Sequence, residues 1–228
     1  MGETATLRAA DNHELDAYVA RPAGQTIAGL VVVQEIFGVN AHIRSVADGY
    51  ARDGFFAVAP ALFDRIERGV ELAYEGAGMQ KALSFIPRLD IVKSFLDVEA
   101  AMHYAAATTG KKVGVIGYCF GGTLAWLAAT RLHAAAAVAY YGGRIANYAA
   151  EKPACPVMLH FGKEDAHIPP EQIEPVRRAH PEVEIYVYEG AGHGFNCDAR
   201  ASYNPGAAKL ARERSLAFLK EWTVSPER

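Results

Sequence analysis

The sequence predicts an α/β fold: a mostly parallel, doubly wound sheet with helices on both faces and an antiparallel hairpin at its N-terminal edge. From residue 30 onward, short apolar segments alternate with longer amphipathic ones, which is the pattern of strands and crossover helices. Before that point, residues 4–9 and 14–20 form two short strand-like segments that turn at Asp11-Asn12. The chain shows no repeat or linker, so we expect one domain over residues 1–228.

Strands are predicted where apolar residues run together, because strands of a parallel sheet are buried on both faces. After the hairpin these segments are residues 30–34, 55–59, 113–116, 135–140, 157–161 and 184–188. The second of them is stopped by Pro60, which lacks the N–H that a ladder needs.

Helices are predicted where apolar side chains recur every three to four residues. These segments are residues 41–53, 90–107, 123–132, 170–179 and 205–222. Asp90 is a suitable N-cap, and Pro205 is suited to a first helical turn. Residues 62–88 have a helix-like composition that glycines and Pro87 interrupt, so we expect a lid or mouth segment beside the sheet.

Composition narrows the possible partners. Hydrophobic residues make up 51% of the chain, charged residues 21%, and the net charge is −3, which provides no basic face for nucleic acid or for a membrane surface. No apolar run approaches transmembrane length. The three cysteines are far apart and form no C-x-x-C motif, which favours a reducing cytoplasm over a disulfide framework. We therefore expect a cytoplasmic protein with neither nucleic-acid nor membrane partners.

The central motif is Gly117-Tyr118-Cys119-Phe120-Gly121-Gly122, between a buried strand and a helix rich in Ala and Leu. This is the context that a G-x-nucleophile-x-G motif requires. The glycines permit close crossing of strand and helix, and the helix dipole favours a thiolate at Cys119. An arbitrary cysteine at a strand end is more often a packing residue, but the partners described next favour a nucleophile.

Those partners are an acid and a base that follow later strands. Asp165 lies in a Gly-x-x-Asp turn after residues 157–161, and His193 lies between two glycines after residues 184–188. Carboxyl ends of parallel strands meet at one edge of a sheet, so Cys119, His193 and Asp165 are predicted to form a catalytic triad. His160 and His167 flank Asp165, but no third ligand has useful spacing, so we expect neither a metal nor a cofactor.

Acyl transfer also needs donors for an oxyanion. The backbone N–H of Phe120 would supply one, and that of Ile36, after the strand at residues 30–34, the other. Glu35 ends this apolar strand, where a carboxylate is costly unless it is paired. We expect it to contact the Cys119 thiol and accept its proton; the alternative is a salt bridge to Arg44 or another arginine.

Four motifs together resemble the dienelactone hydrolase (carboxymethylenebutenolidase) family of the α/β-hydrolase superfamily. They are Gln34-Glu35-Ile36-Phe37-Gly38, the Cys119 motif, the Asp165 turn and Gly192-His193-Gly194-Phe195. The resemblance covers nearly the whole chain. It implies a cysteine hydrolase that opens an unsaturated, carboxylate-bearing lactone, as in chloroaromatic degradation, and a Glu35 that takes the thiol proton only when substrate is bound.

The resemblance also implies substrate-binding residues. Arg65 matches an arginine that binds the substrate carboxylate, and Tyr140, at the end of a strand, is assigned to substrate binding with it. The family's second arginine falls on Cys197, which we interpret as filler in the histidine loop. Arg200, three residues further on, is the candidate to replace that arginine.

The resulting prediction is a cofactor-free hydrolase of a small-molecule lactone or ester. Two alternatives stay open: a carboxylesterase or thioesterase of broader specificity, and a non-catalytic binding or redox-sensing protein built on Cys119. The sequence leaves the physiological substrate and the oligomeric state open, and a monomer is compatible with it.

Overall fold

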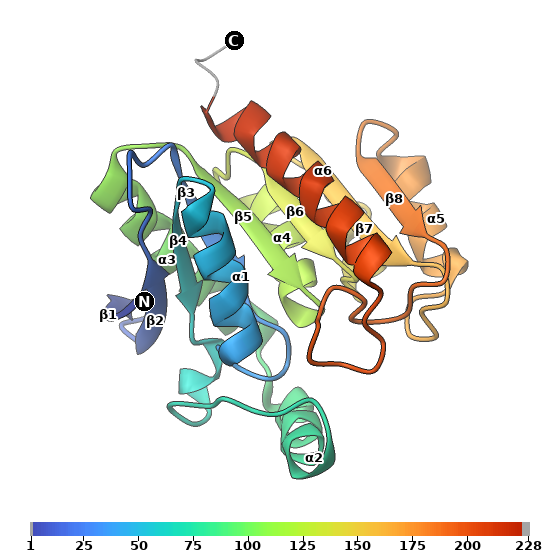
Figure 1. The fold of residues 1–228 in the computed structure, drawn as a ribbon, viewed down its shortest axis with the longest axis horizontal. Helices are drawn as coiled ribbons and strands as arrows, with labels where there is room; N and C mark the ends of the chain where they lie inside the picture. Colours follow the sequence, from blue (N-terminus) through green and yellow to red (C-terminus); the bar gives the residue numbers. More distant parts are fainter. Residues whose placement is uncertain (1, 225–228) are drawn as a thin grey trace.

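Eight strands form one sheet in the order β1-β2-β4-β3-β5-β6-β7-β8 (Figure 1). The computed structural model describes residues 2–224. The strands are β1 (Glu3–Arg8), β2 (Glu14–Ala20), β3 (Ala28–Val33), β4 (Phe55–Pro60), β5 (Val113–Tyr118), β6 (Ala137–Tyr140), β7 (Val157–Gly162) and β8 (Glu184–Tyr188). From β3 to β8 every neighbouring pair is parallel, whereas β2 is antiparallel to both β1 and β4. The predicted α/β fold with an antiparallel edge hairpin is confirmed.

Helices cover both faces of this sheet. They are α1 (Ala41–Arg52), α2 (Gly76–Phe85), α3 (Ile91–Thr109), α4 (Phe120–Arg131), α5 (Pro170–Ala179) and α6 (Pro205–Val224). Figure 1 shows α1 and α6 in front of the sheet and α3 and α4 behind it. Within residues 2–224, no helix combines the length and the apolar character that crossing a bilayer requires.

The core lies between these layers and explains the continuous apolar runs of the sequence. Every residue of β3, β4 and β5 is buried, because helices cover both of their faces. By contrast, the edge strand β1 exposes most of its residues. The central strand β5, which leads to Cys119, is therefore held on all sides by packed neighbours.

Helix ends agree with the capping chemistry read from the sequence. The Asp90 side chain accepts hydrogen bonds from the backbone N–H groups of Val92 and Lys93, at 2.9 and 3.2 Å, and so caps α3. At the other end of α3, Gly110 adopts a left-handed conformation with φ of 62°.

Residues 62–88 are more regular than their glycines indicate. They contain a short 3-10 helix, η1 (Leu62–Arg65), then α2, then a second 3-10 helix, η2 (Ile86–Arg88). Gly76 and Gly78 are in the first turn of α2, and Gly69 precedes the helix, so no glycine interrupts its middle. Figure 1 shows α2 standing apart from the sheet, on the side where β5 ends.

Candidate active site

The turn between β5 and α4 holds Cys119 in a conformation that few residues adopt. Cys119 has φ of 53° and ψ of −115°, a strained backbone that must be held by its surroundings. Its N–H donates to the carbonyl of Tyr140 at 3.0 Å, and the N–H of Gly121 donates to the carbonyl of Gln34 at 3.1 Å. The turn is thus bonded to the ends of both neighbouring strands, which fixes the direction of the Cys119 side chain.

Two glycines make this close crossing possible. A Cβ at Gly117 would lie 1.9 Å from the carbonyl oxygen of Gly121, and a Cβ at Gly121 would lie 2.4 Å from that of Val33. Both collisions are with backbone atoms, which cannot rotate away. Only glycine fits at these two positions, because any larger residue would collide with the backbone.

The predicted triad residues lie together. His193 Nε2 is 3.2 Å from the Cys119 sulfur, and His193 Nδ1 is 2.8 Å from Asp165 Oδ2. The three residues follow β5, β7 and β8, so the sheet brings them to one edge. This is the relation of nucleophile, base and orienting acid that acyl transfer uses.

The Asp165 side chain is held in place by backbone hydrogen bonds in addition to its contact with the imidazole. Its Oδ1 accepts hydrogen bonds from the N–H groups of His167, at 2.8 Å, and Ile168, at 3.2 Å. The side chain has no exposed surface. Burial tends to raise the pKa of this carboxyl, but the hydrogen bond and charge of His193 outweigh it, so the pKa is lowered. Asp165 is therefore a carboxylate that keeps the N–H of His193 on Nδ1.

The imidazole of His193 favours its charged form. Burial lowers its pKa, yet the hydrogen bonds to Asp165 and Cys119 prevail and raise the pKa to about 10. An imidazolium next to a cysteine sulfur stabilises the thiolate. When the sulfur becomes acylated its negative charge is gone, so one cause of the raised pKa disappears. His193 is then better able to accept a proton from water.

A cavity of about 400 Å³ opens above Cys119 and His193. Both expected oxyanion donors, Ile36 and Phe120, line it. One wall is apolar and comes from the segment 62–88 and the residue that follows it, through Met79, Leu83, Ile86 and Leu89. The expected mouth segment therefore forms a wall of this cavity.

Glu35 is fully buried behind the cavity, and its charge partner is Arg200. Neither carboxylate oxygen makes a hydrogen bond within residues 2–224, and the closest cation is Arg200 Nη1, 3.6 Å from Oε1. Arg44, the other partner considered, pairs with Glu71 instead. The expected contact of Glu35 with the Cys119 thiol is not among the hydrogen bonds of this structure, so its role in proton transfer stays a proposal.

Arg200, the candidate to replace the family's second arginine, lies at the wall of this cavity. It lines the cavity with Cys119 and His193, and its guanidinium lies 5.7 Å from the ring centre of Phe37 and 5.5 Å from that of Tyr74. Its side chain is only 17% exposed. The two aromatic rings and Glu35 hold the cation at the cavity wall.

Arg65 does not lie in this cavity, and the expectation that it binds substrate does not fit the structure. Its guanidinium makes two hydrogen bonds to Asp97, at 2.7 and 2.8 Å, and two to Asp11, at 2.7 and 3.0 Å. Asp97 is completely buried, so it needs this cation as a partner. Arg65 thus joins η1 to α3 and to the hairpin turn.

The Tyr140 side chain likewise has a structural role. Its side chain is buried, and its hydroxyl bonds to Ser215 of α6 at 2.8 Å. The Ser215 hydroxyl also contacts His160 Nε2, at 2.9 Å, while His160 Nδ1 bonds to the hydroxyl of Tyr188 at 2.8 Å. The Tyr140 carbonyl therefore binds the Cys119 turn, while its side chain does not reach the cavity. Both ring nitrogens of His160 are engaged in hydrogen bonds and so are not free to bind a metal.

Other cavity residues were not identified from the sequence. Thr123, Arg144 and His167 line it, and the ring of His167 lies 5.2 Å from that of His193. His167 could have been predicted as a cavity residue, because it is two residues from Asp165 in the same loop. Arg144 lies four residues after the end of β6, and this position near a strand end is the only feature of the sequence that indicates a place at the cavity.

Comparison with known proteins agrees with this geometry. The profile of the dienelactone hydrolase family matches residues 15–223. A carboxymethylenebutenolidase of Pseudomonas putida is 33% identical over 225 residues, which cover 95% of each chain. A Synechocystis protein assigned as a carboxymethylenebutenolidase is 36% identical over 222 residues, covering 89% of this chain and 90% of the relative.

A solved structure shows the same fold. It is a crystal structure from Klebsiella pneumoniae subsp. pneumoniae that is assigned as a dienelactone hydrolase, with a TM-score of 0.84 and 28% identity, covering 97% of this chain and 100% of that one. The α/β-hydrolase fold, the triad geometry and the extent of the family match point the same way. The chain belongs to the dienelactone hydrolase family and is a hydrolase of lactone or ester bonds.

Proposed function

We propose that this hydrolase opens carboxylate-bearing lactones of the dienelactone type through an acyl-thioester on Cys119. The observation that carries the proposal is the contact of His193 Nε2 with the Cys119 sulfur at 3.2 Å, on an imidazole oriented by Asp165. The Cys119 thiolate attacks the lactone carbonyl, and the bond from the carbonyl carbon to the ring oxygen breaks as the acyl-enzyme forms. The ring oxygen takes the proton of the His193 imidazolium, which leaves His193 neutral. Water, deprotonated by His193, then attacks the thioester and releases the hydroxy acid or its keto tautomer.

The residues beside the triad have separate roles in this mechanism. The N–H groups of Ile36 and Phe120 stabilise the oxyanion of each tetrahedral intermediate. Glu35 governs activation of the thiol from behind the cavity, where it exchanges partners between Arg200 and the Cys119 proton. This exchange requires that something draw Arg200 away from Glu35, and a substrate carboxylate has the charge to do so.

Arg200 is the group that we assign to the substrate carboxylate, in place of Arg65. It is a cavity-lining cation whose only protein carboxylate, within the described residues, lies 3.6 Å away, beyond a normal hydrogen bond. A charge-assisted bond to a substrate carboxylate is stronger than this contact. In the resting protein, the cation is therefore available to a ligand.

We expect Arg200→Gln to lower kcat/KM for a carboxylate-bearing lactone by about 10- to 100-fold relative to the methyl ester of the same compound, since a hydrogen bond to a charged group contributes about 1.5–3 kcal/mol. Steady-state rates with both substrates give this ratio. The ratio matters because Arg200→Gln also leaves Glu35 without its cation and so slows both reactions. Arg65→Lys is the matched control: it removes a guanidinium outside the cavity and should leave the ratio at its wild-type value.

A specific observation favours a second candidate, a carboxylesterase of broader specificity. Four apolar side chains, from Met79 to Leu89, face the same cavity and suit an alkyl or aryl group. If Arg200→Gln leaves the ratio of the two substrates unchanged while Cys119 stays essential, this esterase is the correct assignment. A place in aromatic degradation depends on the lactone assignment, which this experiment separates from the esterase. The proposed cytoplasmic location depends instead on the three free cysteines.

A further inference from the structure

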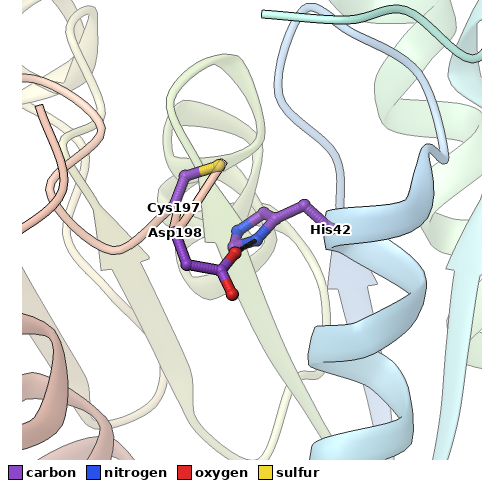
Figure 2. Close-up of side chains that lie close together, drawn as sticks. All are labelled: His42, Cys197 and Asp198. Carbon is purple, nitrogen blue, oxygen red and sulfur yellow. Dashed lines mark hydrogen bonds and ion pairs between the residues drawn. The ribbon is translucent and has the colours of Figure 1, made fainter. Parts of the chain in front are cut away.

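Behind the loop that carries His193, three side chains of metal-binding type converge. They are His42 from the first turn of α1, and Cys197 and Asp198 from the loop between β8 and α6. One ligand atom from each lies within 4.8 Å of the others. Figure 2 shows the His42 ring turned toward the Cys197 sulfur and the Asp198 carboxylate.

The imidazole of His42 has a lone pair that no protein group uses. The His42 side chain is 6% exposed. Its Nδ1 lies 3.3 Å from Asp198 Oδ1, and its Nε2 is buried and makes no hydrogen bond within residues 2–224. A neutral imidazole has one N–H and one lone pair. With the proton on Nδ1, Asp198 accepts it and the free lone pair is on Nε2. With the proton on Nε2, the lone pair of Nδ1 and the Asp198 carboxylate face each other as two acceptors, which is the arrangement that a cation between them would bind.

The spacing of the three atoms suits a tetrahedral ion. Zinc binds histidine nitrogen and carboxylate oxygen at about 2.0–2.1 Å and thiolate sulfur at about 2.3 Å. Two ligands at about 2.0 Å from a tetrahedral centre are roughly 3.3 Å apart, which is the observed distance between His42 Nδ1 and Asp198 Oδ1. The sulfur lies within 4.8 Å of the other two ligand atoms. In a tetrahedral site this separation is about 3.5 Å, so the sulfur must approach by up to about 1.3 Å to complete the site.

A cation can also reach this cluster. The Asp198 side chain is 75% exposed, and a surface cavity of about 400 Å³ is lined by His42 and Asp198. Glu35 adds a second carboxylate near Cys197, whereas Arg200 opposes a cation. A zinc-like ion binds the thiolate form of Cys197, so its binding displaces the thiol proton.

We propose that Cys197, Asp198 and His42 form an open, three-ligand site for a divalent cation of the zinc class, with water as the fourth ligand. A mixed sulfur, nitrogen and oxygen set is characteristic of zinc and cobalt rather than of magnesium or calcium. Because Cys197 lies between His193 and Arg200 in the chain, the ion ties the loop that bears both residues to α1. This site does not depend on the lactone assignment of the preceding subsection.

Cobalt is the probe that tests the site, because a thiolate ligand gives Co²⁺ a strong near-ultraviolet charge-transfer band. The reduced protein is titrated as the Cys119→Ser variant, since Cys119 and His193 together could also bind a metal. We expect a thiolate–cobalt band that saturates at one equivalent and is lost when Zn²⁺ is added. The Cys119→Ser/Cys197→Ser protein should lack the band, while the matched Cys119→Ser/Cys155→Ser protein should keep it.

The other two ligands are tested by affinity. In the Cys119→Ser background, Asp198→Asn and His42→Gln should each weaken cobalt binding by about tenfold or more. Asp198 is exposed, so its replacement does not threaten the fold, and this variant decides the matter even if the His42 variant is unstable. The proposal is overturned if no saturable thiolate band forms, if the band survives loss of Cys197, or if Asp198→Asn binds as tightly as its parent.

Discussion

Cys119→Ala is expected to lose lactonase and esterase activity together, with kcat/KM reduced by about 10⁴-fold or more. The alanine leaves His193, Asp165 and the oxyanion donors in position but removes the sulfur that we propose forms the acyl-enzyme. Measured rates with a carboxylate-bearing lactone and with a neutral ester should therefore fall in parallel. The matched control is Cys155→Ala, which removes a distant, partly buried thiol and should keep wild-type activity with both substrates.

The same variant separates the hydrolase mechanism from other uses of the thiol. If Cys119→Ala retained activity within about tenfold of wild type, another nucleophile would be at work. If neither protein hydrolysed any ester while Cys119 oxidised reversibly under mild peroxide, a redox sensor would be the better description of the function.

Gly117→Ala is expected to destabilise the fold strongly. The new Cβ would lie 1.9 Å from the Gly121 carbonyl oxygen and 2.3 Å from its carbonyl carbon. Relief requires the strand β5 and the helix α4 to separate, in the middle of a fully buried layer. We expect a loss of about 4 kcal/mol or more, or no soluble protein at all.

Thermal unfolding measures this effect. For a domain of this size, about 1 kcal/mol lowers the Tm by roughly 2–4 °C, so a drop of about 8 °C or more is expected. Gly24→Ala is the control, because a Cβ there meets no atom within 4 Å. A Gly117→Ala protein that melts with the wild type would show that strand and helix are not as tightly crossed as the structure has them.

The parts of the fold and site that follow from local sequence were predictable. The strands of the parallel sheet are continuous apolar runs because both faces are covered, and the same burial makes their ends easy to find. Cys119 follows the end of β5 directly, Asp165 lies three residues beyond β7, and His193 lies five residues beyond the partly exposed edge strand β8. Parallel topology then brings them to one edge, so the hydrogen bonds from His193 to Cys119 and Asp165 follow from three local patterns and one architectural rule.

Arg65 and Tyr140, which were expected to bind substrate, are not among the residues that line the cavity, and their side chains are held by partners far away in the chain. Arg65 follows a strand end as the triad residues do, but its orientation is decided by Asp97, 32 positions later, and by Asp11, 54 positions earlier. The Tyr140 side chain points into the interior, where its hydroxyl forms a hydrogen bond with the hydroxyl of Ser215 on α6. No local sequence pattern indicates such pairs between residues that are distant in the chain. Arg200 was named from the sequence as the candidate to replace the family's second arginine, but its place at the cavity depends on the course of the loop after His193, which sequence spacing does not determine.

The central claim, that Cys119 carries the acyl group, is tested most directly by trapping that group. The His193→Ala protein, in which hydrolysis of the thioester lacks its base, is mixed with an activated ester, quenched in acid and digested for mass spectrometry. We predict an acyl adduct of the expected mass on the peptide that contains Cys119, absent after Cys119→Ala. An adduct on Cys155, Cys197 or a serine, with Cys119 unmodified, would contradict the account.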